Sequence, residues 1–297
     1  MRKVLVTGAS GFVGRHLLKY LLEQNFDVHV AYRNSAYRPN DVTIHLADLL
    51  EPGEAERLMK AVQPTHLLHL AWDVSPGLFW HARNNLDWVV ASLALYRAFV
   101  NVGGKRAVFT GTCAEYDWGS EWLDETSTPR KPQTLYGVAK NSLFDLITAV
   151  GEPHTQFAWG RLFFLYGPGE PPKRLVPDVM DSLLRGMEIA CTSGRQERDF
   201  LHVADAARAL VSVLVSDYCG AVNIASGECH PVRAIVEKIG VLAGRPELLR
   251  FGAKHSPENE PKRLVANVSV LKGLGFTPRY SLDEGLKQTW EWRQNPN

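Results

Sequence analysis

The sequence has few cysteines, and they are not arranged as metal ligands. Its four cysteines show no C-x-x-C or Cys/His ligand spacing: Cys113, Cys191, Cys219 and Cys229. This pattern excludes a zinc site of the usual spacing, and it favours reduced thiols over disulfides. We therefore predict a cytoplasmic protein that binds no metal.

The sequence also lacks a strong net charge and a long apolar run. It has 33 Lys and Arg residues against 32 Asp and Glu residues, a formal net charge of +1. Without a broad basic field, neither nucleic acid nor an anionic membrane is expected as a main partner. No apolar stretch approaches transmembrane length, and the N-terminus enters a predicted strand without a signal-peptide pattern.

A glycine-rich turn lies between a predicted strand and a predicted helix near the N-terminus. Residues 3–6 are an apolar run typical of a buried strand, and residues 15–23 have helical apolar spacing. A tight turn in this place brings backbone N–H groups close to a pyrophosphate. An ordinary glycine-rich βα turn that binds no ligand can have the same sequence pattern. The strand-turn-helix context instead favours cofactor binding. The predicted cofactor-binding residues of this turn are Gly8, Ser10, Gly11, Phe12, Val13 and Gly14.

Apolar strand-like runs alternate with helical patterns through the first half of the chain. The runs lie at residues 28–31, 66–70, 107–110 and 157–162. This alternation predicts an α/β fold with a Rossmann-type doubly wound parallel sheet.

Three prolines after residue 169 mark a change in organisation: Pro171, Pro172 and Pro177. We predict a dinucleotide-binding domain over residues 1–167, with returning segments near 198–217 and 262–275. The remaining segments of 168–297 would form a smaller, interleaved substrate lobe. Its predicted elements are a helix at 176–185, a segment at 221–225 and a helix at 232–243.

The most informative motif is Tyr136-Gly-Val-Ala-Lys140, which follows the glycine turn by about a hundred residues. A Tyr four residues before a Lys is by itself often one face of a helix. In this order and at this separation, the two motifs together resemble the extended short-chain dehydrogenase/reductase family, in particular its nucleotide-sugar epimerase, dehydratase and reductase branch.

Further motifs of that family occur in family order along nearly the whole chain. They are Asp48-Leu49, His69-Leu70-Ala71, Asn85, Thr112 before Tyr116, Arg161-Leu-Phe-Phe-Leu-Tyr-Gly-Pro168, Arg198-Asp-Phe-Leu-His-Val203 with Asp205, and Leu274-Gly-Phe-Thr-Pro278.

The resemblance implies a catalytic trio. Tyr136 would exchange a proton with the reacting carbonyl or hydroxyl, and Lys140 would lower the pKa of Tyr136 and bind the nicotinamide ribose. Thr112 would orient the reacting oxygen. Asp48, Leu49, Leu70 and Ala71 would contact the cofactor.

Cofactor choice depends on the end of the second predicted strand, where an acidic residue would bind the ribose hydroxyls of NAD. Tyr32 and Arg33 stand there instead. An arginine pairs well with the 2′-phosphate of NADP, so NADP(H) is favoured while NAD(H) remains possible. Arg15 or Arg38 is a further candidate for binding the 2′-phosphate of NADP.

For the substrate, the resemblance implies that Arg198 binds the diphosphate of a nucleotide-sugar. Lys173 and Arg174 are further candidates, although loop cations are often simply exposed. Two positions depart from the family pattern. Phe164 replaces an Asn that contacts phosphate, and the late arginine is absent around Ser256–Pro261, which leaves Lys254 or Arg263 as substitutes.

The reaction type is narrowed by Cys113 and Ala114, which stand where sugar dehydratases of this family carry an Asp-Glu pair. Cys113 is then a candidate substrate contact, or a small buried residue. The leading prediction is an NADPH-dependent reductase of a nucleotide-linked 4-keto-6-deoxy or dideoxy sugar. The alternatives are a nucleotide-sugar 4-epimerase with tightly bound NAD, a ketone reductase of a non-sugar metabolite, and a non-catalytic NADP sensor.

The resemblance also implies a homodimer, formed through helices at 85–102 and 136–150.

Overall fold

The central feature of the fold is a parallel sheet of seven strands. The structure of the chain, a computed structural model, describes residues 2–34, 37–120, 122–256 and 260–295. The strand order is β11-β6-β5-β4-β1-β2-β3, and every pairing within this sheet is parallel. The predicted doubly wound sheet is therefore confirmed. Its strands are β1 (Lys3–Thr7), β2 (Asp27–Tyr32), β3 (Thr43–Leu46), β4 (His66–His69), β5 (Arg106–Thr112), β6 (Gln156–Leu162) and β11 (Gly220–Ile224).

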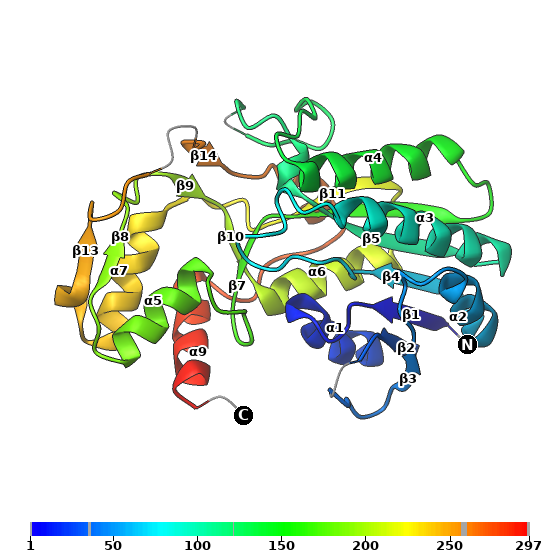
Figure 1. Cartoon of the computed structure of the whole chain (residues 1–297), viewed down its shortest axis with the longest axis horizontal. Coiled ribbons are helices and arrows are strands. Elements are labelled where there is room, and N and C mark those ends of the chain that lie inside the picture. The colour runs from blue at the N-terminus through cyan, green and yellow to red at the C-terminus, as the bar shows by residue number, and fades with distance from the viewer. Residues whose placement is uncertain (1, 35–36, 121, 257–259, 296–297) are drawn as a thin grey trace.

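Helices cover both faces of the sheet (Figure 1). On one face, α1 (Phe12–Glu23) packs against α6 (Val203–Val215), and their apolar sides form a core with the strands. On the other face, α2 (Glu54–Val62), α3 (Asn85–Asn101) and α4 (Leu135–Val150) form a second core. Burial on both faces explains why the central strands are continuous apolar runs rather than alternating ones.

The predicted place of residues 221–225 in the second lobe is wrong. They lie in β11, which pairs with β6 from Gly220 opposite Ala158 to Ile224 opposite Leu162. After β6 the chain leaves for the second lobe and returns through α6, which forms the crossover to a parallel strand at the edge of the main sheet. A five-residue apolar run does not indicate which sheet it will join.

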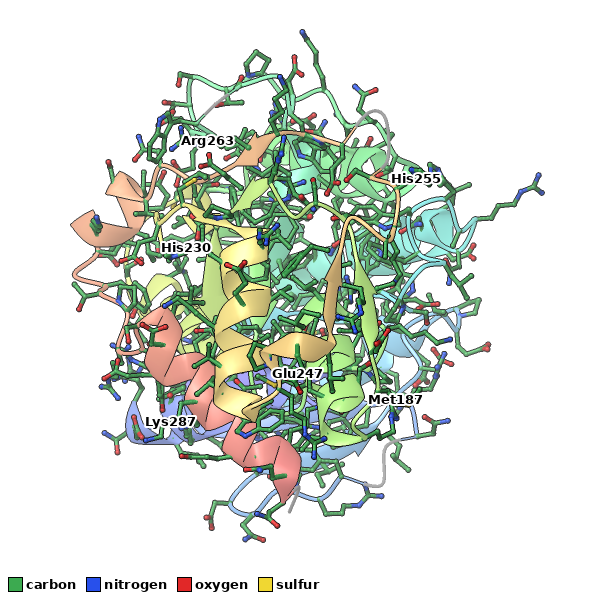
Figure 2. The ribbon with its side chains drawn as sticks, turned by 90° about the vertical axis from the view of Figure 1, so that its left-hand side faces the viewer. Met187, His230, Glu247, His255, Arg263 and Lys287 are labelled. Atoms are coloured by element: carbon green, nitrogen blue, oxygen red, sulfur yellow. The ribbon has the colours of Figure 1, made fainter. Side chains whose placement is uncertain are left out.

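The second lobe is a helical cluster at one end of the sheet (Figure 1). Its core is formed by apolar residues of α5 (Leu175–Leu184), α7 (Val232–Ala243) and α9 (Leu282–Gln294), including Trp290. The predicted helices at 176–185 and 232–243 are thus confirmed. Viewed from this end, α7 lies beside α9 (Figure 2). β13 (Leu249–Phe251) pairs with β8 (Ile189–Cys191) at the outer side of this lobe (Figure 1).

Two small sheets connect the lobes. β7 (Phe164–Tyr166) pairs with β10 (Phe200–His202), and β9 (Glu197–Arg198) lies between β12 (His230–Pro231) and β14 (Arg263–Leu264). Short helices complete the chain: η1 (Cys113–Glu115), η2 (Pro246–Leu248) and α8 (Ser269–Gly273). Across the described ranges, none of the helices combines the length and the apolar character that a bilayer crossing requires.

Candidate active site

One cavity of about 730 Å³ gathers nearly all of the predicted site residues. Its walls come from the carboxyl ends of the sheet strands, from the start of α1 and from α5 and α7 of the second lobe. The carboxyl edge of a doubly wound sheet is where ligands of such folds bind. The predicted residues in its lining are Gly8, Ser10, Gly11, Phe12, Val13, Gly14, Arg33, Asp48, Leu49, Leu70, Ala71, Thr112, Cys113, Tyr136, Lys140, Arg174 and Arg198.

Lys173 is the predicted residue that lies outside this lining. Its φ angle is 64°, and its backbone N–H donates to Asp178 Oδ1 at 2.8 Å. Lys173 therefore shapes the approach to α5, while its neighbour Arg174 reaches the cavity.

The glycine turn is shaped for close approach to an anion. Gly8 has a φ angle of +74°, and a Cβ atom on Gly14 would clash with the Gly8 carbonyl oxygen. Gly11 caps α1 without a side chain, and the first turn of α1 has no acidic residue. The first-turn N–H groups are thus left for an anionic ligand, as the pyrophosphate of a dinucleotide requires.

The far end of the cavity has no carboxylate at the end of β2. Tyr32 and Arg33 line it, and Asp48 uses its carboxylate to accept the N–H of Leu50 at 3.1 Å. The side chain of Arg33 is exposed. Arg15 donates to Ser10 O at 2.8 Å, and its guanidinium lies 5.1 Å from the centre of the Tyr37 ring.

Tyr136 lies in the first turn of α4, where the Thr134 hydroxyl caps the helix by accepting the N–H of Gly137 at 3.1 Å. The Tyr136 side chain is almost fully buried. Burial raises its pKa above the ordinary tyrosine value, and a hydrogen bond with the Thr112 hydroxyl opposes this rise. The phenol is therefore protonated at neutral pH, as its predicted role of proton donor requires.

Lys140 follows one turn later and is enclosed. Its Nζ donates to Thr110 O at 2.8 Å and lies 3.8 Å from the centre of the Trp72 ring. Burial lowers the pKa of Lys140 to about 7. We predicted that Lys140 lowers the pKa of Tyr136, but the net shift at Tyr136 is upward, because burial penalises the charged form of both side chains.

Trp72 is held in place by Asn85. The Trp72 indole N–H donates to Asn85 Oδ1 at 2.8 Å, and Asn85 Nδ2 donates to Phe79 O at 2.8 Å. Asn85 is fully buried, so these bonds fix the loop between β4 and α3. This role was not predicted for Asn85.

Aromatic rings surround the Tyr136 phenol. Ring centres lie 4.9 Å away for Phe79, 5.9 Å for Trp80 and 6.3 Å for Trp72, all in edge-to-face arrangements. The backbone N–H of Tyr136 also donates to Trp80 O at 3.1 Å. The wall around the Tyr136 phenol is therefore largely aromatic.

A buried ion pair supports Thr112 from behind. Arg161 Nε lies 2.7 Å from Glu115 Oε2, and both side chains are within 1% of full burial. Glu115 also accepts the Thr112 backbone N–H at 2.8 Å and the Trp159 indole N–H at 3.0 Å. Glu115 thus anchors the turn that presents Thr112 and Cys113.

The candidate substrate cations already have partners within the protein. Arg198 is buried, and it donates to Pro261 O at 2.8 Å and to Glu260 Oε1 at 3.0 Å. Arg174 donates to Val74 O at 3.4 Å, with its guanidinium 5.4 Å from the Phe79 ring centre. Neither Lys254 nor Arg263 lines the main cavity.

Two positions that depart from the family pattern differ in what the structure describes. Phe164 lines the cavity, 5.6 Å from the Arg198 guanidinium. Residues 257–259, within the segment where the late arginine is absent, lie outside the described residues.

Cys113 is buried, and it lines the same cavity as Thr112, Tyr136 and Lys140. Burial raises the pKa of its thiol to about 12. A thiol with this pKa stays neutral at physiological pH, so Cys113 contributes a small uncharged wall rather than a thiolate.

Comparison with known proteins agrees with this arrangement. The chain is 22% identical to a CDP-abequose synthase of Salmonella muenchen over 294 residues, covering 97% of this chain and 96% of that protein. Its fold matches the UDP-glucose 4-epimerase of Thermotoga maritima, solved with UDP-glucose, at a TM-score of 0.88 and 24% identity over 98% of each chain. It also matches the Thermus thermophilus UDP-glucose 4-epimerase complex with NAD, at a TM-score of 0.87 and 23% identity over 99% of this chain and 100% of that one.

Residues 4–225 match the NAD dependent epimerase/dehydratase family. That range includes the glycine turn, the Tyr136 and Lys140 pair and the strand that returns to the main sheet. The chain therefore belongs to this family, and it is an NAD(P)-dependent enzyme of the extended short-chain dehydrogenase/reductase type.

Proposed function

We propose that the protein is an NADPH-dependent reductase of a nucleotide-linked 4-keto-6-deoxy or dideoxy sugar. The observation that carries this proposal is the end of β2, where Tyr32 and Arg33 rather than an acidic residue line the cavity. A cationic side chain there favours NADP over NAD. A net reduction consumes an exchangeable NADPH, whereas an epimerase recycles its cofactor.

The chain's own residues support a proton transfer in this direction. The cofactor, when bound, supplies a hydride. Tyr136 holds a proton at its phenolic oxygen, and the upward shift of its pKa keeps that proton in place until an alkoxide develops. Thr112 orients the reacting oxygen through its hydroxyl, and the surrounding rings exclude water.

The aromatic wall supports a deoxygenated substrate. Phe79 and Trp80 face Tyr136, where the carbons next to the reacting carbonyl must lie. A methyl group packs against such rings, whereas a hydroxymethyl group would lose its hydrogen bonds to water there. This supports a 6-deoxy sugar over a hexose that keeps its 6-hydroxyl.

A nucleotide-linked substrate is supported by Arg198 and Arg174, which line the second-lobe side of the cavity. Their guanidinium groups suit a diphosphate. For this contact Arg198 must exchange or share its bond to Glu260. The CDP-abequose synthase among the similar proteins is named for a CDP-linked compound, which supports the same substrate class.

A nucleotide-sugar 4-epimerase is the second candidate. The observation that favours it is the match of the whole fold to UDP-glucose 4-epimerases. It would use the same Tyr136 and Thr112 to remove and restore a proton. Tightly bound NAD(H) in the purified protein would favour this candidate.

We also propose that the chain forms a homodimer. Large apolar side chains are exposed on the two neighbouring helices α3 and α4: Leu86, Val90, Val138, Leu146 and Val150. Such a face suits a second copy of the chain.

We further propose that the two lobes bind different ligands. Residues 1–167, with returning segments near 198–217 and 262–275, would bind the cofactor. The other segments of 168–297 would bind the substrate.

The experiment that tests the function is a spectrophotometric assay at the absorbance band of reduced nicotinamide. NADPH and NADH are offered separately with TDP-, GDP-, CDP- and UDP-linked 4-keto-6-deoxy sugars. We expect NADPH consumption with one nucleotide and much slower consumption of NADH. Consumption with none of the four would contradict the reductase, and interconversion of a 4-epimer pair without net NADPH use would establish the epimerase instead.

Arg33→Ala tests the cofactor preference directly. Losing a charge-assisted contact to the 2′-phosphate should raise the KM for NADPH by about 10- to 100-fold. The KM for NADH should hardly change, because NADH has no phosphate there. Lys19→Ala is the matched control, since Lys19 is an exposed cation of α1 outside the cavity lining. Equal effects of Arg33→Ala on both cofactors would argue against this role.

A further inference from the structure

Glu170 lies in a turn that is fixed against the dinucleotide-binding helices. Its backbone N–H donates to Gly167 O at 3.2 Å. His16 of α1 is hydrogen-bonded to Pro168 O at 2.9 Å. The turn that carries Glu170 is therefore tied to α1, and Glu170 lines the reaction cavity. No motif in the sequence pointed to this residue.

The carboxyl group of Glu170 is buried, and its Oε2 atom has no hydrogen-bond partner among the described residues. The side chain is 8% exposed. Within the described ranges, Oε2 has no hydrogen-bond partner and neither oxygen belongs to an ion pair. A buried polar group without a partner costs free energy, and native structures keep few of them. Because this carboxyl lines a cavity, a ligand in that cavity is the partner that would remove the cost.

The charged groups near Glu170 are already engaged. Arg293 of α9 binds both carboxylate oxygens of Asp181, at 2.5 and 2.7 Å. Arg174 donates to Val74 O, and Asp178 of α5 accepts the Lys173 N–H. Burial outweighs the attraction of the two arginines and raises the pKa of Glu170 to about 8, so the group is a neutral carboxylic acid at pH 7.

Glu170 lines the same cavity as Tyr136 and Arg174. The charge of Arg174 acts on both Glu170 and Tyr136. The Arg174 guanidinium lies 5.4 Å from the Phe79 ring centre, which in turn is 4.9 Å from the Tyr136 ring centre. A ligand large enough to fill this cavity therefore contacts both Tyr136 and Glu170.

We propose that Glu170 is a specificity-determining residue whose unpartnered carboxyl group hydrogen-bonds a hydroxyl group of the sugar ring. A hydroxyl fits because it both donates and accepts, and a carboxylic acid offers one O–H and one free acceptor oxygen. A phosphate group fits less well, since it would meet an ionised carboxylate as the pH rises. This inference rests on the proposed function, because it names a contact to that substrate.

The contact between Glu170 and the sugar hydroxyl should weaken as the pH rises. Below a pH of about 8, Glu170 keeps its proton and donates. Above it the group ionises, loses its donor and brings an unpaired charge into the cavity. The KM for the keto-sugar should therefore rise between pH 7 and pH 9. Lys140 also titrates in this range, so the change at Glu170 is isolated by comparing variants.

The test uses the full-length enzyme with Glu170→Leu and Glu170→Gln. At pH 7, Glu170→Leu should raise the KM for the keto-sugar about tenfold or more, with the dissociation constant for NADPH from fluorescence titration unchanged. Glu170→Gln keeps a donor and an acceptor at every pH, so it should retain the KM and lose its alkaline rise. Glu291→Gln, an exposed carboxyl on α9, is the control.

Thermal stability separates this role from a structural one. Because the unpartnered carboxyl costs free energy, Glu170→Leu without ligand should unfold at the wild-type temperature or above it. A wild-type KM in Glu170→Leu, or an alkaline rise as large in Glu170→Gln as in the wild type, would overturn the proposal.

A binding measurement keeps the result independent of turnover. TDP-, UDP-, GDP- and CDP-linked 6-deoxy-glucose, which cannot be reduced, are added to the NADP-loaded enzyme, and the rise in unfolding temperature is recorded. A rise in the wild type that is lost in Glu170→Leu supports the contact even if no keto-sugar is reduced, in which case the reductase alone fails. An equal rise in both proteins, or none in the wild type with any of the four, would overturn the contact.

Discussion

Replacing Tyr136 by phenylalanine should lower kcat for the keto-sugar by about 100- to 10,000-fold, the usual contribution of a positioned general acid. The change removes only the phenolic oxygen. The ring contacts with Trp72, Phe79 and Trp80 remain, so the fold should be preserved. The measurement is the initial rate of NADPH oxidation at saturating substrate, together with the dissociation constant for NADPH.

Tyr116→Phe is the matched control for Tyr136→Phe. Tyr116 is also a buried tyrosine, but its hydroxyl donates to Asn223 Oδ1 at 2.7 Å and accepts from Arg161 at 3.0 Å, away from the cavity lining. Losing this hydroxyl should lower stability and leave kcat near the wild-type value. If both variants lost kcat to the same extent, Tyr136 would be acting through the fold and not as the proton donor.

The parts of the site that could be predicted are those held by the backbone. The glycine turn needs positive φ and close approach at fixed spacing, and Tyr136 and Lys140 lie one helical turn apart on α4. Such constraints leave a local pattern in the sequence. The same holds for the alternation of strands and helices, which predicted the doubly wound sheet.

The parts that were missed depend on contacts between distant segments. Glu170 became notable only because α5, α9 and the turn before it bury its carboxyl without a partner. Lys173 and Arg174 are adjacent in sequence, yet only Arg174 reaches the cavity. Burial raises the pKa of Tyr136, and the burying rings come from a separate loop, so the motif alone does not indicate this contribution.

A second large effect is expected from the ion pair behind Thr112. Glu115→Ala would leave the Arg161 guanidinium buried with no carboxylate, and breaking one partner of a buried pair costs about 3–5 kcal/mol. Domains of this kind have a total stability of about 5–15 kcal/mol, so the loss is a large share of it. Urea unfolding should show a much lower midpoint with an unchanged slope.

Two further variants test whether the stability loss in Glu115→Ala comes from the unpaired buried charge or from lost packing. Glu188 pairs with Arg250 on the exposed edge of the second lobe, so Glu188→Gln should leave the unfolding midpoint unchanged. Replacing Glu115 and Arg161 together by Leu and Met should recover part of the stability lost in Glu115→Ala, because no charge then remains unpaired. Equal midpoints for Glu115→Ala and the wild type would mean that Arg161 finds another partner or reaches water.

Glu115→Ala should also lower activity under conditions in which the variant is fully folded. The Glu115 carboxylate accepts the Thr112 backbone N–H at 2.8 Å, and the Thr112 side chain in turn accepts the N–H of Ala114 at 3.2 Å. Without the carboxylate, this turn loses its anchor and Thr112 no longer presents its hydroxyl to Tyr136 in one orientation. We expect kcat to fall while the dissociation constant for NADPH stays the same, because the cofactor-binding turn before α1 is not connected to this network. A wild-type kcat in the folded variant would show that Thr112 keeps its position without Glu115, and the ion pair would then serve stability alone.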